Sequence, residues 1–143
     1  MDAQEIYRKA ATYCAYQDRC LAELHEKFRV WEVPPKVAAE VLARLAEDKF
    51  LDEARYARSF VGGKFRSNHW GRVKIRYALR QKGIPAALIE AALGQIDEEQ
   101  YWEALRKLAS AKKTTKATLP ALYRSLVTKG YEPDLVRAVL KMD

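Results

Sequence analysis

The chain has 143 residues, of which 49% are hydrophobic and 31% charged, so it is long and apolar enough to bury a globular core. Its formal net charge of +7 points to an anionic partner. The sequence has no apolar run of about 18 residues, no signal peptide, and no metal-ligand spacing among Cys14, Cys20, His25 and His69. These absences exclude membrane-spanning, secreted and metal-binding classes, and we expect a cytoplasmic protein with reduced cysteines.

Helical periodicity runs through almost the whole chain. Apolar residues recur at spacings of three and four, as in Leu21, Leu24 and Phe28, and strict alternation over the length of a strand is absent. Ala, Leu, Glu, Lys and Arg, which favour helix, dominate most segments. The pattern predicts an all-α fold.

A repeat of two helices appears when the chain is aligned with itself. Residues 78–93 match residues 125–140 at an offset of 47, and residues 27–42 fit the same frame. Within the repeat, Gly83 and Gly130 occupy the same position, where glycine closes a helix in the left-handed conformation. The repeat therefore predicts a helix, a tight turn and a second helix in each copy.

The turns of the three copies differ in one respect. Pro85 and Pro133 lie just after the glycine, at the start of the next helix, where a missing N–H costs little. In the first copy Glu32 stands in place of the glycine, so we expect that turn to close differently.

A further helix precedes each pair. The three segments expected to form it are 3–15, 53–66 and 98–112, and acidic residues at 52–53 and 97–99 mark two of the helix starts. The chain thus divides into three three-helix units, which we place at 1–52, 53–97 and 98–143. Because each unit is too short to bury much alone, we expect an elongated, curved array of tandem units. The alternative is one compact bundle.

The charge is unevenly distributed along the chain. Residues 54–89 carry a net charge of +9 and residues 104–131 carry +7, and neither block contains an acid. Residues 1–53, 90–103 and 132–143 carry −3, −5 and −1. Charge that only solvates a surface would be spread more evenly.

The first basic block is the best candidate binding surface, because nine positive charges without an acid repel one another and favour an anionic partner. Its aromatics Phe60 and Phe65 recur at helical spacing, which predicts core positions. Trp70 either packs beneath a loop or projects to the partner. The candidate binding residues are Arg55, Arg58, Lys64, Arg66, Trp70, Arg72, Lys74, Arg76, Arg80 and Lys82.

Two segments of small and polar residues, Gly62-Gly63 and Ser67–Gly71, are expected to interrupt the helices around this block. In the later block the tract Lys112–Lys116 is expected to be an exposed loop between helices. No nucleotide-binding glycine motif, zinc-protease motif or catalytic triad signature is present. The acids at 97–99 are better explained as a helix start than as a catalytic pair. We expect a binding protein with no enzymatic activity and no cofactor.

Three segments of the chain carry recognisable motifs. Phe50–Val61 (FLDEARYARSFV) and Trp70–Ile84 (WGRVKIRYALRQKGI) are similar to the central signatures of the RecX family of regulatory proteins. Asp18–Phe28 (DRCLAELHEKF) is similar to its N-terminal element Arg-Ser-x-x-Glu-Leu-x-x-Lys-Leu, with Cys20 in place of the usual serine and Phe28 in place of the usual leucine. Trp31-Glu32 replaces the family's common Lys-Gly.

The resemblance implies a non-enzymatic regulator built from tandem three-helix units. RecX proteins bind the RecA recombinase in its filament on single-stranded DNA and usually inhibit strand exchange, ATP hydrolysis and repressor cleavage, thereby modulating DNA repair and the SOS response. Some members also bind single- or double-stranded DNA directly. The resemblance implies that the elongated molecule lies in the groove of the filament. Either a simple block of the groove or disassembly of the filament would explain inhibition.

We expect the first basic block to contact the RecA filament that the resemblance implies as the target. Arg66, Arg72, Lys74, Arg76 and Arg80 are expected to face the groove. Reversing the charge at positions 72, 74 and 76 is expected to abolish inhibition and to leave the helical fold intact.

The alternative function is non-specific DNA binding that is independent of RecA. Three-helix units resemble helix-turn-helix folds, in which the second helix of the pair reads the major groove. Here that segment, Pro85–Ile96, is rich in alanine, carries Glu90 and has Gln95 as its only amide. This composition disfavours sequence-specific reading of DNA.

Overall fold

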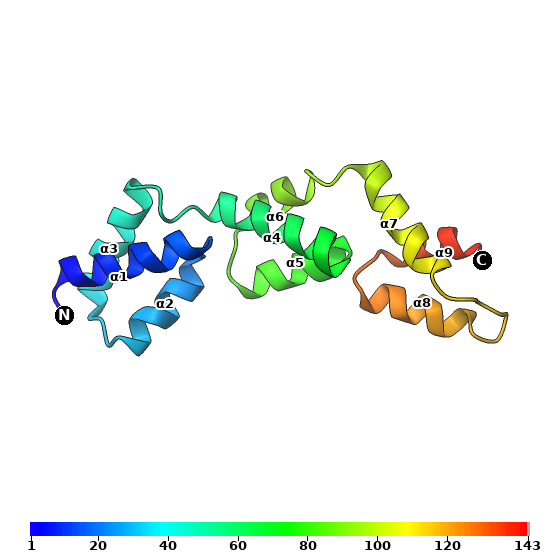
Figure 1. The fold of residues 1–143 in the computed structure, drawn as a ribbon, viewed down its shortest axis with the longest axis horizontal. Coiled ribbons are helices and arrows are strands. Elements are labelled where there is room, and N and C mark those ends of the chain that lie inside the picture. The colour runs from blue at the N-terminus through cyan, green and yellow to red at the C-terminus, as the bar shows by residue number, and fades with distance from the viewer. Residues whose placement is uncertain (143) are drawn as a thin grey trace.

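The computed structural model describes residues 1–142, and within that range it has nine helices and no strand (Figure 1). The all-α prediction is confirmed. The helices are α1 (Ala3–Tyr16), α2 (Leu21–Val30), α3 (Pro35–Glu47), α4 (Glu53–Asn68), α5 (Arg72–Gln81), α6 (Ala86–Leu93), α7 (Glu98–Ser110), α8 (Leu119–Thr128) and α9 (Pro133–Leu140).

The helices form three groups of three, which follow one another along the long axis of the molecule (Figure 1). We call them the N-terminal unit (α1–α3), the middle unit (α4–α6) and the C-terminal unit (α7–α9). Each group surrounds its own cluster of buried apolar side chains. The elongated array is therefore confirmed and the single compact bundle is wrong. The residue boundaries expected between units, at 52/53 and 97/98, stay a prediction.

The first helices of the middle and C-terminal units begin where acidic residues predicted them, and α1 begins in the same way. The side chains of Asp2, Asp52 and Asp97 cap α1, α4 and α7, each accepting a hydrogen bond from a backbone amide three residues later at 2.8, 3.0 and 3.0 Å. Such a cap satisfies an amide that has no partner within the helix and contributes about 1 kcal/mol.

The turn between α2 and α3 closes in the same way as its two counterparts, so the expectation of a different closure is wrong. Gly83 and Gly130 have φ of 75° and 109°, and Glu32 has φ of 54°. The backbone amides of Val33 and Ile84 donate to the carbonyls of Phe28 and Leu79 at 2.9 and 3.1 Å. Glu32 thus takes the left-handed conformation without glycine's freedom, at a cost of about 1 kcal/mol. Its side chain is exposed to solvent.

The pair Gly62-Gly63 does not interrupt a helix, which corrects the prediction made from these residues. α4 continues through both glycines to Asn68, and only residues 69–71 connect it to α5. A methyl group on Gly62 would lie 2.5 Å from the Arg66 guanidinium, which folds back along the helix over this position. A methyl group on Gly63 would meet nothing within 4 Å. The glycines are tolerated because α4 packs against α5 and α6 along its length.

The middle and C-terminal units are joined through their backbones. The amide of Gly71 donates to the Lys129 carbonyl at 2.9 Å, and the amide of Val73 donates to the Gly130 carbonyl at 2.9 Å. A methyl group on Gly71 would lie 2.3 Å from the carbonyl carbon of Gly130, so only glycine fits. Phe65 packs against the apolar cores of both units, so apolar packing continues across this junction.

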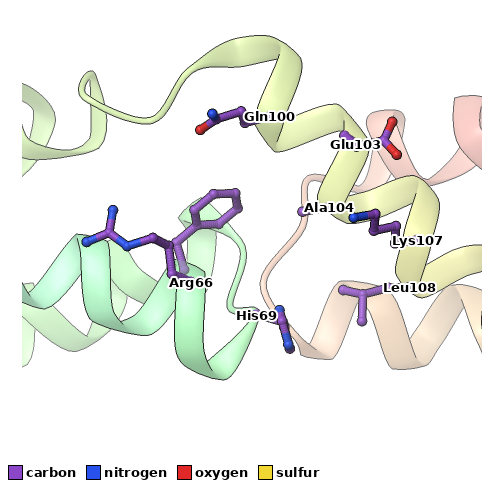
Figure 2. A pocket seen from close by; sticks show the side chains of 8 residues that line it. Arg66, His69, Gln100, Glu103, Ala104, Lys107 and Leu108 are labelled. Atoms are coloured by element: carbon purple, nitrogen blue, oxygen red, sulfur yellow. The ribbon is translucent and has the colours of Figure 1, made fainter.

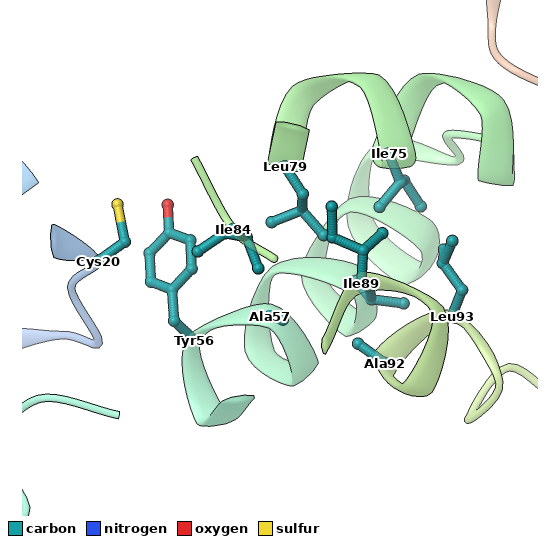
Figure 3. Packing of buried hydrophobic residues seen from close by; sticks show 10 residues of the cluster. Cys20, Tyr56, Ala57, Ile75, Leu79, Ile84, Ile89, Ala92 and Leu93 are labelled. Atoms are coloured by element: carbon teal, nitrogen blue, oxygen red, sulfur yellow. The ribbon is translucent and has the colours of Figure 1, made fainter. Parts of the chain in front are cut away.

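The N-terminal and middle units share one buried residue. Cys20 precedes α2, yet its side chain is fully buried in the core of the middle unit, beside Tyr56 (Figure 3). Burial raises the pKa of the Cys20 thiol, so it stays protonated and unreactive near neutral pH. Cys20 anchors the N-terminal unit to its neighbour by packing.

None of the helices formed by residues 1–142 is both long enough and apolar enough to span a lipid bilayer.

Candidate partner-binding surface

Arg72 lies at the junction of the middle and C-terminal units and is held there by acids of the C-terminal unit. Its guanidinium donates to Glu132 at 2.7 Å and to Glu98 at 3.0 Å, and it stacks on the Tyr101 ring at 3.8 Å from the ring centroid. The Tyr101 hydroxyl donates to the other oxygen of Glu132 at 2.5 Å and accepts the backbone amide of Arg72 at 2.9 Å. The Arg72 side chain is only 18% exposed. It therefore positions the two units relative to each other.

Arg55 has a similar role at the other junction. Its guanidinium donates to Asp18 of the N-terminal unit at 2.8 Å and to the carbonyls of Lys49 and Phe50 at 3.1 and 3.2 Å. Ser59 donates to the second oxygen of Asp18 at 2.7 Å. The hydrogen bond from Ser59, followed by the hydrogen bond and the charge of Arg55, lowers the pKa of the Asp18 carboxyl, against the effect of its partial burial.

Two more basic residues of the block are paired with acids. Arg76 donates to both oxygens of Glu90 at 2.8 and 3.0 Å, which ties α5 to α6 within the middle unit. The hydrogen bond from Arg76 lowers the pKa of Glu90. The Lys82 ammonium lies 3.6 Å from the Glu23 carboxylate, across the junction with the N-terminal unit.

Trp70 packs against the core of the middle unit, with its ring edge-on to Phe60 at 6.4 Å between centroids. The packing expected as one alternative is thus present, and contact of Trp70 with a partner stays a prediction. The ammonium groups of Lys64 and Lys74 lie 4.8 and 4.4 Å from the Trp70 ring centroid. Phe60 and Phe65 are half-buried against the core, as predicted.

The remaining basic residues have no acidic partner. Within residues 1–142 no carboxylate lies within 4 Å of the charged groups of the candidate residues that we call the unpaired basic set: Arg58, Lys64, Arg66, Lys74 and Arg80. Arg58, Arg66 and Arg80 are exposed to solvent. The set does not form one cluster. Lys64 and Arg66 are two positions apart on α4, so their side chains leave opposite sides of the helix.

Arg58 and Arg66 border a groove between α4 and α7. A cleft of about 530 Å³ lies between the end of α4 and the side of α7, with His69 at its edge and Lys107 on the α7 wall (Figure 2). A smaller cavity of about 140 Å³ continues it along α4. We call the two together the α4–α7 groove. Its lining includes Arg58, Phe65, Arg66, Gln95, Gln100, Ala104, Lys107 and Leu108.

The sequence did not single out the α7 side of this groove. Gln100, Ala104 and Lys107 recur along one face of α7, but nothing in their spacing shows that this face meets α4. The junction around Arg72 and Gly71 sets that arrangement.

The outer face of α5 presents apolar side chains beside the unpaired basic set. Val73 is 45% exposed and Tyr77 is 64% exposed, one turn apart on the helix, and Arg80 follows on the same face. In the C-terminal unit the tract Lys112–Lys116 is an exposed loop between α7 and α8, as predicted.

Two family models agree with the three-helix organisation of the N-terminal and middle units. Residues 7–45 match the model described as the first three-helix domain of RecX, and residues 52–93 match the second three-helix domain. A regulatory protein RecX of Pseudomonas savastanoi is 34% identical over 139 residues, which cover 94% of this chain and 89% of the relative. One of Clostridium botulinum is 41% identical over 105 residues, 68% of this chain and 49% of the relative. The chain spans about half the length of the Clostridium botulinum relative. It also spans about half of a regulatory protein RecX of Bacillus mycoides, of which 54% is covered.

Solved structures show the same architecture. A crystal structure of regulatory protein RecX aligns with a TM-score of 0.84 and 26% identity, over 97% of this chain and 71% of the other. The crystal structure of RecX from Lactobacillus salivarius aligns with a TM-score of 0.86 and 23% identity, over 97% and 94% of the two chains, which supports the fold. With two successive RecX domain models matched and a relative 34% identical over nearly its whole length, the chain belongs to the RecX family of regulatory proteins.

Proposed function

We propose that this protein binds the RecA filament on single-stranded DNA and inhibits its ATPase, strand-exchange and coprotease activities. The observation that carries the proposal is the division of the basic block into two classes. Acids of the chain hold Arg55, Arg72 and Arg76 in place, whereas the unpaired basic set has no such partner within the described residues. Charges that the fold does not use are available to an anionic partner.

This division changes which residues are assigned to binding. Arg55, Arg72, Arg76 and Lys82 hold helices and units together, so their effect on a partner is indirect. Replacing Arg72 with glutamate would place a third carboxylate beside Glu98 and Glu132. That change would damage the junction, so a triple reversal that includes it does not test binding alone.

The elongated shape supports a filament as the target. Three units in a row, joined by a backbone contact at one junction and by Asp18, Arg55 and Cys20 at the other, form a long surface (Figure 1). Such a surface suits a partner that repeats along an axis, because neighbouring units then contact neighbouring subunits. We propose that the unpaired basic set faces acidic protein surface or DNA phosphates in the filament groove.

RecA-independent DNA binding is the second candidate, and one observation favours it: Lys64 and Lys74 hold two positive charges over Trp70. The composition of α6 argues against reading of bases, because Ala86–Leu93 carries no basic or amide side chain and Gln95 lies beyond the end of the helix.

Binding measurements separate the two functions. Fluorescent oligothymidine is titrated with the protein, with and without RecA and a slowly hydrolysed ATP analogue, at several salt concentrations. We expect association with the RecA-coated strand that persists where binding to bare DNA is lost. Equal binding to bare DNA, with a steep decline as salt rises, would instead support the second candidate.

A further inference from the structure

The α4–α7 groove combines an apolar floor with a basic rim. Phe65, Ala104 and Leu108 form the apolar part, and the cleft between them holds about 530 Å³. Arg58 and Arg66 on one wall and Lys107 on the other have no ion-pair partner among residues 1–142. Among residues 1–142, Glu103 is the only acid that lines the cleft, and its carboxylate lies 3.5 Å from the Arg106 guanidinium.

We infer that this groove binds an extended acidic segment of a partner protein, with one apolar side chain of the segment in the cleft and flanking carboxylates on Arg58, Arg66 and Lys107. The inference rests on the proposed function, since the segment would belong to the protein component of the target, and it names the chemistry that the groove recognises. Gln95 and Gln100 supply amides for the backbone of such a segment.

The dimensions of the groove suit a peptide. The Cα atoms of Arg58 and Arg66 are eight residues apart on α4, about 12 Å along the helix axis, and the Arg66 guanidinium folds back over Gly62 towards Arg58. An extended peptide covers that distance in about four residues. Acids on either side of an apolar residue can therefore reach both guanidinium groups while the apolar side chain enters the cleft beside Phe65.

A nucleic-acid strand fits the groove less well. The Phe65 ring in the floor already stacks on Tyr101 at 5.8 Å between centroids, which occupies one face that a base would use. Glu103, whose carboxylate pairs with Arg106 at 3.5 Å, places an acid in the wall, and this acid disfavours an unbroken row of phosphates more than two spaced carboxylates. The largely apolar floor contributes nothing to binding of a phosphate backbone and favours an apolar side chain.

The groove exists only because the two units are fixed relative to each other. One wall belongs to α4 and the other to α7, and the contacts of Gly71 with Gly130 and of Arg72 with Glu132 hold them in register. A segment bound there would bridge the middle and C-terminal units.

The test uses the whole ¹⁵N-labelled protein and three probes: a glutamate-rich peptide with a central leucine, the same peptide with serine in place of leucine, and oligothymidine. We expect the leucine peptide to shift the amide resonances of α4 and α7 around the groove. The serine peptide should bind at least about tenfold more weakly than the leucine peptide, because its serine leaves the cleft unfilled. No shift with the leucine peptide, shifts confined to other helices, or stronger shifts at the groove with oligothymidine would overturn the inference.

Variants give the second arm. The R58E/R66E variant should bind the leucine peptide at least about tenfold more weakly than the wild type. The A104F variant should also bind it more weakly, because the phenylalanine fills the cleft. K112E/K113E makes the same change of charge in the exposed loop between α7 and α8 and should leave binding unchanged. Circular dichroism verifies that each variant is folded. Unchanged binding by folded R58E/R66E would overturn the inference.

The same samples are tested with RecA, so that the two proposals fail separately. If the wild-type protein inhibits RecA but binds no peptide, the groove assignment is wrong and the proposed function stands. If it binds the peptide at the groove but has no effect on RecA, the proposed function is wrong and the groove assignment stands.

Discussion

Gly71 and Gly130 are in backbone contact across the junction of the middle and C-terminal units. The carbonyl of Gly130 accepts the amide of Val73 at 2.9 Å, and its carbonyl carbon lies 2.3 Å from where a methyl group on Gly71 would be. Two segments far apart in the sequence therefore pack without any side chain between them. The α4–α7 groove and the length of the molecule both depend on this contact.

Substituting Gly71 with alanine should open this junction. The methyl group has no space, so the units must separate or the backbone must shift, at a cost of about 1–3 kcal/mol in unfolding free energy. Urea denaturation followed by circular dichroism measures the loss. G63A is the matched control, because its methyl group meets nothing within 4 Å, and it should stabilise α4 by up to about 1 kcal/mol. Equal stability of G71A and the wild type would contradict the assigned contact.

Arg72 should behave as a structural residue. R72A removes two ion pairs and leaves Glu132 partly buried without its guanidinium partner, which should cost about 1–3 kcal/mol of unfolding free energy. R58A, on an exposed side chain with no ion pair within residues 1–142, should change stability by less than about 0.5 kcal/mol. A double-mutant cycle with E132A measures the coupling. Additive losses in that cycle would mean that the pair does not hold the units together.

Glu32 offers a stabilising substitution. Because its φ of 54° lies in the left-handed region, E32G should raise the unfolding free energy by about 1 kcal/mol. E40G places glycine at an exposed position inside α3 and should lower it by about 1 kcal/mol. Thermal denaturation of both variants distinguishes the two effects, and a loss of stability in E32G would argue against the left-handed turn.

The helices follow from local patterns, which is why the sequence predicts them. The signals that define the helices act within a few residues of the chain, so they can be recognised in a single sequence. They are the amphipathic spacing, the caps at Asp52 and Asp97 and the glycines of two turns. The predicted helix break at Gly62-Gly63 is wrong because the packing of α4 outweighs the weak preference of glycine against helix.

The division of the basic block was not predictable from the sequence. Arg72 and Arg58 look alike there, since each stands in a stretch without acids. Only the fold brings Glu98 and Glu132 to Arg72 and leaves Arg58 facing a groove. Long-range pairing of charges is set by how the units dock, which has no local signature.

The junction between the N-terminal and middle units should be sensitive to acid. The hydrogen bonds from Ser59 and Arg55 lower the pKa of Asp18 below its unfolded value. Its contribution to stability is therefore fully present above that unfolded value, about 3.9, and is lost as the pH falls through the lower folded pKa. D18N should cost about 1–2 kcal/mol at pH 7.

The measurement for Asp18 is urea denaturation of the wild type and D18N at pH 7 and near pH 3. The difference in unfolding free energy between them should shrink at the lower pH. S59A, which removes the largest cause of the shift, should reduce the pH dependence of the wild type. A difference between wild type and D18N that is constant with pH would contradict the assignment.

The most direct test of the central claim measures ATP hydrolysis by RecA on single-stranded DNA with fewer protein molecules than RecA protomers. The wild type and the loop control K112E/K113E should inhibit hydrolysis equally. For a folded variant with Arg58, Arg66 and Arg80 changed to glutamate, the concentration that gives half inhibition should be at least about tenfold higher than for the wild type. No inhibition by the wild type at any ratio, or undiminished inhibition by that folded variant, would contradict the account.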